Sequence, residues 1–211
     1  VWTTDWKGGN GFGYASSKDL IHWSEQQYIP VMKNEPEVVN VWAPEIFYDD
    51  VKKEYIIIWA STIPFRFEKG VEEEKNNHRM YYVTTKDFKT FSDTKLYYEP
   101  GFSVIDCVIV KKGKKDYVLV LKDNTRPMRN IKVAFGKSPL GPFEKPSKPL
   151  TEYLSEGPTV VKVGKNWLLY YDNYGSKNYK ALSTTDFVHF EDVSSKITLP
   201  EGHKHGTITT V

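Results

Sequence analysis

The chain has 211 residues, which is enough for one large hydrophobic core. Its 29 Lys and Arg nearly balance its 27 Asp and Glu, so charge gives no reason to expect a nucleic-acid partner or an anionic membrane surface. A single cysteine, Cys107, excludes an internal disulfide and a cysteine-based metal site, and the lack of a run of about 18 apolar residues excludes a helical membrane span.

A polar turn that closes on an aromatic residue recurs along the chain. Its four copies occupy residues 17–23, 85–91, 137–143 and 185–190, each after a short strand-like run. The central residues of the copies are 68, 52 and 47 residues apart: Asp19, Asp87, Pro139 and Asp186. This spacing is typical of the blades of a β-propeller and is too long for most helical solenoids.

Apolar hairpins alternate with these turns. Each hairpin has an apolar strand, a tight polar turn and a second apolar strand, and the hairpins occupy residues 45–59, 107–121 and 159–171. Their β-branched and aromatic composition predicts β-hairpins. The continuous apolar runs predict strands that are covered on both faces, as where blades stack. No window shows a long apolar stripe of helical period, so we expect an all-β fold.

Counting the repeats predicts an incomplete five-bladed β-propeller in a single domain. The end of blade 1, blades 2 to 4 and the start of blade 5 are expected at residues 1–40, 41–98, 103–150, 155–200 and 204–211. An open sheet end leaves unpaired backbone groups, so a propeller closes into a ring. Three full units with two partial ones do not complete that ring. We therefore expect the chain to be a fragment that is truncated at both ends.

Strand order predicts the end of the propeller where a ligand binds. When the first strand of each blade lines the channel, the residues before strand 1 and the loop between strands 2 and 3 surround the same channel mouth. The residues before strand 1 include four ionisable side chains at spacings of 61, 50 and 49 residues: Glu45, Asp106, Glu156 and His205. The strand 2–3 loops are expected at residues 4–11, 62–79, 122–130 and 172–178.

Ionisable groups that converge in a narrow channel suggest a chemical role. Their desolvation costs free energy, and such a cost is typical of functional sites. Converging carboxylates raise each other's pKa, which keeps one of them protonated near neutral pH. Cleavage of a glycosidic bond requires such a group, because the leaving oxygen must receive a proton. Structural alternatives remain: Glu156 as a turn carboxylate before Gly157, and Asp106 as an internal hydrogen-bonding group.

These segments resemble glycoside hydrolase family 43, the five-bladed arabinosidase, xylosidase and arabinanase group. The resemblance covers the whole chain in order, through short motifs at residues 42–46, 105–106, 138–143, 155–158 and 205–207. It implies inverting hydrolysis of arabinose or xylose linkages in plant-type poly- or oligosaccharides. Glu156 takes the role of the acid, and Asp106 that of the residue that tunes and orients it. The base is implied on an inner strand upstream of Val1, and Asp5 is no substitute because it falls in a strand 2–3 loop.

The resemblance also implies a secreted or periplasmic enzyme that requires no cofactor. His205 would lie in mid-channel, where relatives often hold a water molecule or a metal such as Ca²⁺, so we expect any metal contact of His205 to run through water. The nearby His203 brings no third protein ligand, which gives no support for a zinc site.

Six side chains are candidates for binding the substrate: Trp42, Glu45, His205, Trp6, Lys122 and Arg126. Trp42 and Trp6 have flat faces that suit a sugar ring. Lys122 and Arg126, expected in a strand 2–3 loop, suit hydrogen bonds to sugar hydroxyls. The alternatives are a core position for the tryptophans, a turn cap for Glu45 and a solvated loop for the two basic residues.

Three other functions are compatible with a propeller. A retaining, invertase-like fructan hydrolase would need Arg-Asp-Pro at the middle acidic strand and Glu-Cys at the acid, where this chain has Ile105-Asp106-Cys107 and Glu156-Gly157. A non-catalytic sugar-binding propeller would lack the base. A protein-binding propeller would have no need of carboxylates inside its channel.

Overall fold

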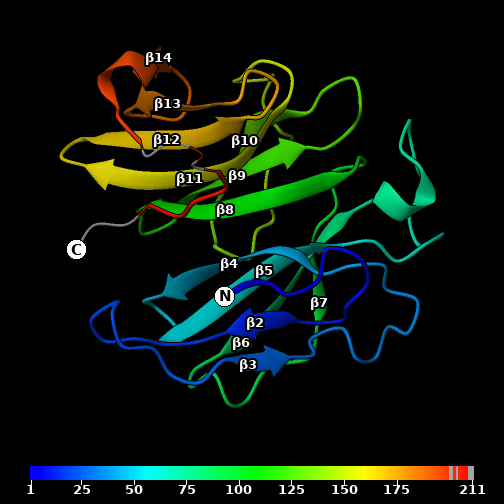
Figure 1. The fold of residues 1–211 in the computed structure, drawn as a ribbon. Coiled ribbons are helices and arrows are strands. Elements are labelled where there is room, and N and C mark those ends of the chain that lie inside the picture. Colours follow the sequence, from blue (N-terminus) through cyan, green and yellow to red (C-terminus); the bar gives the residue numbers. More distant parts are fainter. Residues whose placement is uncertain (200–201, 203, 209–211) are drawn as a thin grey trace. The chain divides into compact units, whose positions relative to one another are not determined.

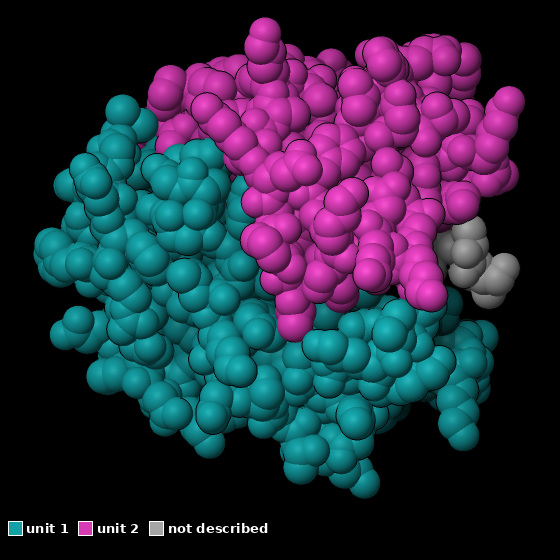
Figure 2. Space-filling model, turned by 180° about the vertical axis from the view of Figure 1, so that it is seen from behind, with its two compact units in different colours: residues 1–105 teal, residues 106–211 magenta. Residues whose placement is uncertain are grey.

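The computed structural model describes residues 1–199, 202 and 204–208, and nearly all regular structure in them is β-strand (Figure 1). The chain divides into two compact units, residues 1–105 and 106–211 (Figure 2). The described helices are two short 3₁₀ turns, Glu74–Asn76 and Ser194–Lys196, and no described helix is long and apolar enough to cross a membrane. The prediction of an all-β fold is confirmed.

The first unit contains two antiparallel sheets. The three-stranded sheet has the order β1 (Trp2–Thr3), β2 (Phe12–Tyr14) and β3 (Gln27–Ile29). The four-stranded sheet has the order β4 (Trp42–Asp49), β5 (Glu54–Ser61), β6 (Arg79–Thr85) and β7 (Lys95–Tyr98). Ile57 and Trp59 of β5 are fully buried in one cluster with Phe12 of β2. The apolar run of β5 is therefore buried, as its composition predicts.

The second unit repeats this arrangement. One sheet has the order β10 (Asn130–Gly136), β9 (Asp116–Asp123) and β8 (Val104–Gly113), whose first two residues precede the unit boundary. The other has the order β11 (Ser155–Val163), β12 (Asn166–Asn173), β13 (Asn178–Thr184) and β14 (Glu191–Asp192). Val118 and Val120 of β9 share a buried cluster with Leu169 of β12 and with Phe187. The core of this unit thus lies between its two sheets.

The repeated turn has the same hydrogen bonds in three of its copies. In the first copy the Ser17 hydroxyl accepts the N–H of Leu20, and Oδ1 of Asp19 accepts the N–H groups of Ile21 and His22. The copies around Asp87 and Asp186 repeat this pattern, with the hydroxyls of Thr85 and Thr184 as acceptors. The residue after each aspartate has a positive φ, of 62°, 55° and 64°: Leu20, Phe88 and Phe187. Local side-chain hydrogen bonds therefore determine this turn.

The sheets can be placed against the predicted blades. They span residues 2–29, 42–98, 104–136 and 155–192, so each falls within one predicted range. Residue 200 of the predicted fourth blade and residues 209–211 of the predicted fifth lie outside the described residues. The division of the chain into blades, and its boundaries, stay predictions.

Candidate active site

A β-bulge interrupts the first strand of each four-stranded sheet. In β11 the register with β12 shifts between Glu156 and Thr159, and in β4 the register with β5 shifts between Trp42 and Glu45. The second residue of each bulge has a positive φ, 54° at Gly157 and 47° at Ala43, and a proline follows both. The two bulges thus align Trp42 with Glu156, and Glu45 with Thr159.

This register corrects the predicted equivalence of four ionisable residues. Glu45 follows its bulge, whereas Glu156 precedes its own, so the two glutamates occupy different places in their strands. Asp106 and His205 have positive φ values of 53° and 43°, like Gly157 and Ala43. The prediction aligned charges and missed the bulge, which displaces Glu45 by three residues. Aspartate tolerates this left-handed backbone better than most residues do.

Four ionisable side chains of the second unit come together. Asp106 lies in β8, Lys122 in β9, Glu156 in β11, and His205 in the segment after β14. The Nζ atom of Lys122 donates to Oε2 of Glu156 at 2.7 Å. The Nε2 atom of His205 lies 3.6 Å from Oε1 of Glu156 and 3.7 Å from Oδ2 of Asp106. The residues predicted as acid and tuning residue are thus neighbours.

Burial increases from the imidazole to the ammonium group of this cluster. The exposed fraction of the side chain is 44% for His205, 26% for Glu156, 5% for Asp106 and 2% for Lys122. The ring of Tyr174 lies 5.4 Å from Nζ of Lys122. His205 packs against Gly157, where a Cβ atom would lie only 2.9 Å from Cγ of the imidazole. Glycine suits this position because it adopts a positive φ without strain and leaves room for the imidazole.

The two cations decide the protonation state of Glu156. Burial alone would raise its pKa, but the nearby imidazole of His205 and the charge of Lys122 outweigh burial and lower the pKa of Glu156 to about 2. The carboxylate of Glu156 and the charge of Asp106 in turn raise the pKa of His205 to about 9, against the effect of its burial. The expectation that converging carboxylates keep one of them protonated is therefore wrong for Glu156. At neutral pH the proton resides on His205.

The structure corrects the placement of Lys122 and leaves Arg126 where it was expected. Lys122 is not in a loop: it lies in β9, paired with Ile131 of β10, and its side chain is buried against Glu156. Arg126 lies in the loop between β9 and β10 and is exposed. The sequence reasoning missed the Lys122–Glu156 ion pair and the role of Gly157. A lysine that directly follows the apolar run of β9 is the signal that points to a buried charge.

The cluster is a poor fit for a divalent metal. Asp106, Glu156 and His205 could each offer one ligand atom, within 4.8 Å of one another, but Ca²⁺ takes six to eight oxygen ligands. Oδ2 of Asp106 already accepts the N–H of Gly157 at 3.1 Å, and Oε2 of Glu156 already accepts Lys122. A metal-binding histidine must be neutral, whereas its neighbours raise the pKa of His205. The residues present do not fit the implied calcium ion.

The first unit holds the other predicted binding residues. Trp42 stacks on Trp6 with ring centroids 4.8 Å apart and an interplanar angle of 15°, and its Nε1 donates to the carbonyl of Trp6. The ring of His78 lies 5.0 Å from that of Trp42. Trp6 is 72% exposed, so a flat aromatic face is open to solvent. Glu45 lies opposite Ile58, and burial raises its pKa to about 7. A meeting of Glu45 with Asp106 and Glu156 stays a prediction.

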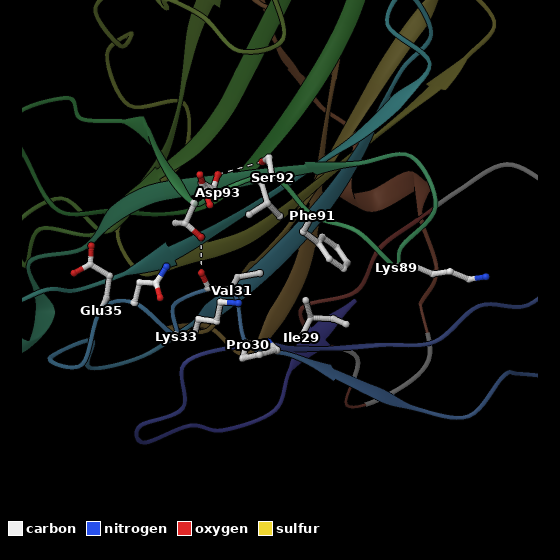
Figure 3. Close-up of a pocket in the computed structure, with 12 residues that line it drawn as sticks. Ile29, Pro30, Val31, Lys33, Glu35, Lys89, Phe91, Ser92 and Asp93 are labelled. Carbon is white, nitrogen blue, oxygen red and sulfur yellow. Dashed lines mark hydrogen bonds between the residues drawn. The ribbon is translucent and has the colours of Figure 1, made fainter.

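The first unit also has a cavity of about 330 Å³, away from the predicted substrate-binding residues (Figure 3). Most of its wall is formed by residues between 29, the last residue of β3, and 35, and by residues between 89 and 94, before β7. The Thr94 hydroxyl donates to the carbonyl of Val31, and the dashed line that ends beside Val31 in Figure 3 marks this bond. Trp6, Trp42 and Glu45 do not line this cavity, so it is distinct from the predicted substrate-binding residues.

A family model described as a probable glycosyl hydrolase domain, related to glycoside hydrolase family 43, matches residues 2–211. An alpha-L-arabinofuranosidase of Bifidobacterium longum subsp. longum is 26% identical over 106 residues, which are 46% of this chain and 10% of that protein. The chain therefore spans only a small part of the curated relative it matches.

Solved structures resemble the chain at lower identity. A thermostable family-43 glycoside hydrolase has a TM-score of 0.69 at 13% identity, over 95% of this chain and 72% of its own. A xylan beta-1,4-xylosidase of Bacillus halodurans C-125 has a TM-score of 0.65 at 17% identity, over 97% of this chain and 45% of its own. At such identity the likeness establishes the fold alone, which is that of the family-43 β-propeller enzymes.

Proposed function

We propose that this chain carries the proton-donating part of an active site that hydrolyses O-glycosyl bonds. The chain belongs to the family of probable glycosyl hydrolase domains that is related to glycoside hydrolase family 43. The observation that carries the proposal is the cluster of Asp106, Glu156 and His205 in the second unit. Arabinose or xylose linkages of plant-type saccharides are the proposed substrates. The arabinofuranosidase and xylosidase names of two similar proteins support that choice.

Glu156 is the proposed proton donor to the leaving oxygen. Because its carboxylate is ionised at rest, the proton must reach it first, and the imidazolium of His205 lies 3.6 Å from its Oε1. Transfer from Nε2 of His205 to Oε1, and from there to the glycosidic oxygen, completes the donor step as the C–O bond breaks. A water molecule adds to the sugar carbon and passes its proton to a base.

Asp106 is proposed to orient this pair, and its geometry argues against the role of an inverting base. An inverting acid and base are about 6.5–9.5 Å apart, whereas the ligand atoms of Asp106 and Glu156 lie within 4.8 Å. Asp106 is also 5% exposed and accepts the N–H of Gly157, which leaves little room for an activated water.

The short Asp106–Glu156 separation favours one rival, a retaining hydrolase, whose two carboxyl groups are about 5–5.5 Å apart. The two mechanisms differ in the anomer that is released first. Proton NMR of a reaction in progress distinguishes them: we expect the inverted anomer, and the retained anomer would instead support the retaining rival.

A substrate screen tests the function itself. The complete protein, including the upstream strand that is expected to supply the base, is incubated with aryl α-L-arabinofuranosides, aryl β-D-xylosides and the matching oligosaccharides, and Glu156→Gln is run in parallel. We expect cleavage by the parent protein that is lost in Glu156→Gln. Saccharide binding without cleavage in the parent would instead support the non-catalytic sugar-binding propeller, and full turnover by Glu156→Gln would refute the proton-donor role.

A further inference from the structure

We propose that the ammonium group of Lys122 is the built-in cation of this site and takes the place that a divalent metal would take beside the two carboxylates. The inference depends on the proposed function only for identifying the site. Its test measures metal binding and folding stability, so it can fail while hydrolysis is confirmed, or hold while hydrolysis is refuted.

The position of Lys122 in strand β9 places its ammonium group inside the protein. Lys122 follows the fully buried residues 118–121 and is paired with Ile131 of β10. Its side chain is 2% exposed, so water cannot replace a lost partner at Nζ. A buried ammonium is costly unless it is paired, and Oε2 of Glu156 at 2.7 Å supplies that pairing. The ring face of Tyr174 adds a second favourable contact.

The cation lies where the negative charges gather. Asp106 faces the cluster from β8 and Glu156 from β11, with the buried Asp172 of β12 paired opposite Glu156. The two oxygens of Glu156 have different cations, Lys122 at Oε2 and His205 at Oε1. Asp123, the residue after Lys122 in β9, pairs with a different cation, because its Oδ2 accepts a hydrogen bond of 2.6 Å from Nζ of Lys132. Lys122 is therefore committed to the Asp106–Glu156 cluster.

The unmodified protein provides the first test. Thermal unfolding is followed with millimolar CaCl₂, with millimolar MnCl₂ and with EDTA. We expect the same Tm in all three, since Lys122 already occupies the position of a cation and repels another. A Tm that rises with Ca²⁺ or Mn²⁺, or one that falls with EDTA, would overturn the proposal.

The second test removes the cation. Lys122→Met leaves Glu156 without its partner at Oε2, so we expect Tm to fall by roughly 5 °C. We also expect the variant to gain a rise in Tm with Ca²⁺ or Mn²⁺, because Oε2 of Glu156 then lacks its fixed cation. Lys132→Met is the matched control: it also breaks a buried ion pair, yet it leaves one carboxylate outside the cluster and should gain no response to metal.

A double variant keeps the test decisive if Lys122→Met does not fold. Lys122→Met/Glu156→Gln removes both charges of the pair, so we expect it to fold and to be more stable than Lys122→Met alone. Strictly additive effects, or a Lys122→Met protein that shows neither lower Tm nor a new metal response, would overturn the proposal.

Discussion

The backbone N–H of Gly157 donates a hydrogen bond of 3.1 Å to Oδ2 of Asp106, which lies 51 residues earlier in the chain. This bond joins β11 to β8, two strands of different sheets in the second unit. It fixes the orientation of the Asp106 carboxylate beside Glu156. A small change at Gly157 is therefore expected to disturb both carboxylates.

Replacing Glu156 by glutamine tests proton donation. Glu156→Gln keeps the size of the side chain and removes its ability to carry a proton, so we expect kcat on unactivated substrates to fall about 10²–10⁴-fold. Saccharide binding should persist. Glu152→Gln is the control, since Glu152 forms an exposed ion pair with Lys180. Comparable losses in both variants would show a general effect of charge removal instead of proton donation.

Replacing Gly157 by alanine tests the packing of His205. Both Gly157 and Gly164 have positive φ values, 54° and 60°, so alanine is strained by about 1–2 kcal/mol at either position. At Gly157 the new Cβ also meets the imidazole at 2.9 Å, whereas nothing lies within 4 Å at Gly164. We expect Gly157→Ala to lower the free energy of unfolding by roughly 1 kcal/mol more than Gly164→Ala does, as measured by urea unfolding. Equal losses would mean that His205 does not pack there.

The stability of the protein should depend on pH through His205. Its pKa is raised from 6.5 to about 9 by Glu156 and Asp106. The folded state therefore holds this proton more tightly than the unfolded state, and the resulting stabilisation is fully present below pH 6.5 and lost as pH rises through 9. We expect the free energy of unfolding to decrease over that interval, and His205→Gln to reduce the slope. An unchanged slope in His205→Gln would contradict the assignment.

The contribution of Glu156 to stability has the opposite dependence on pH. Its pKa is lowered from 4.5 to about 2, so its stabilising contribution is present above pH 4.5 and disappears as pH falls through 2. Glu156→Gln should flatten the acid side of the stability profile and leave the alkaline side with a smaller His205 contribution. Urea unfolding at a series of pH values measures both effects.

Removing Trp6 tests the exposed aromatic face. Trp6→Ala deletes a ring that is 72% exposed and stacked on Trp42. If that face stacks on sugar rings, oligosaccharide affinity should fall about 3–10-fold. Trp23→Ala is the control, because Trp23 is 57% exposed but lies in the repeated turn at residues 17–23. Titration calorimetry compares the two, and equal affinities would exclude Trp6 from the binding surface.

The strands and turns could be predicted because their causes are local. The turn around Asp87 closes through hydrogen bonds within six residues, 85–90, and its sequence contains every group involved. The apolar run of β5 likewise contains the reason for its own burial. The grouping of Asp106 with Glu156 was predicted because each residue shortly precedes a similar apolar run, at residues 107–110 and 159–161.

The electrostatics of the site could not be predicted, because they depend on pairings between strands. Lys122 follows an apolar run and precedes Asp123 and Asn124, a polar series that suggests the end of a strand, and only its register with β10 places it inside. Reasoning without that cation predicts a raised pKa for Glu156, whereas the structure gives a lowered one. The displacement of Glu45 had a visible signal in the two prolines, Pro44 and Pro158, that follow the bulges.

The sole cysteine of the sequence follows Asp106 directly and is 1% exposed. Burial and the adjacent charge of Asp106 raise the pKa of its thiol, so a thiol reagent can modify Cys107 only when β8 separates from its neighbours. The labelling rate of the unmodified chain thus reports transient opening beside the carboxylate cluster, with no probe to be introduced. Saccharides that close over the cluster would slow that rate, which makes ligand screening practicable even where no bond is cleaved.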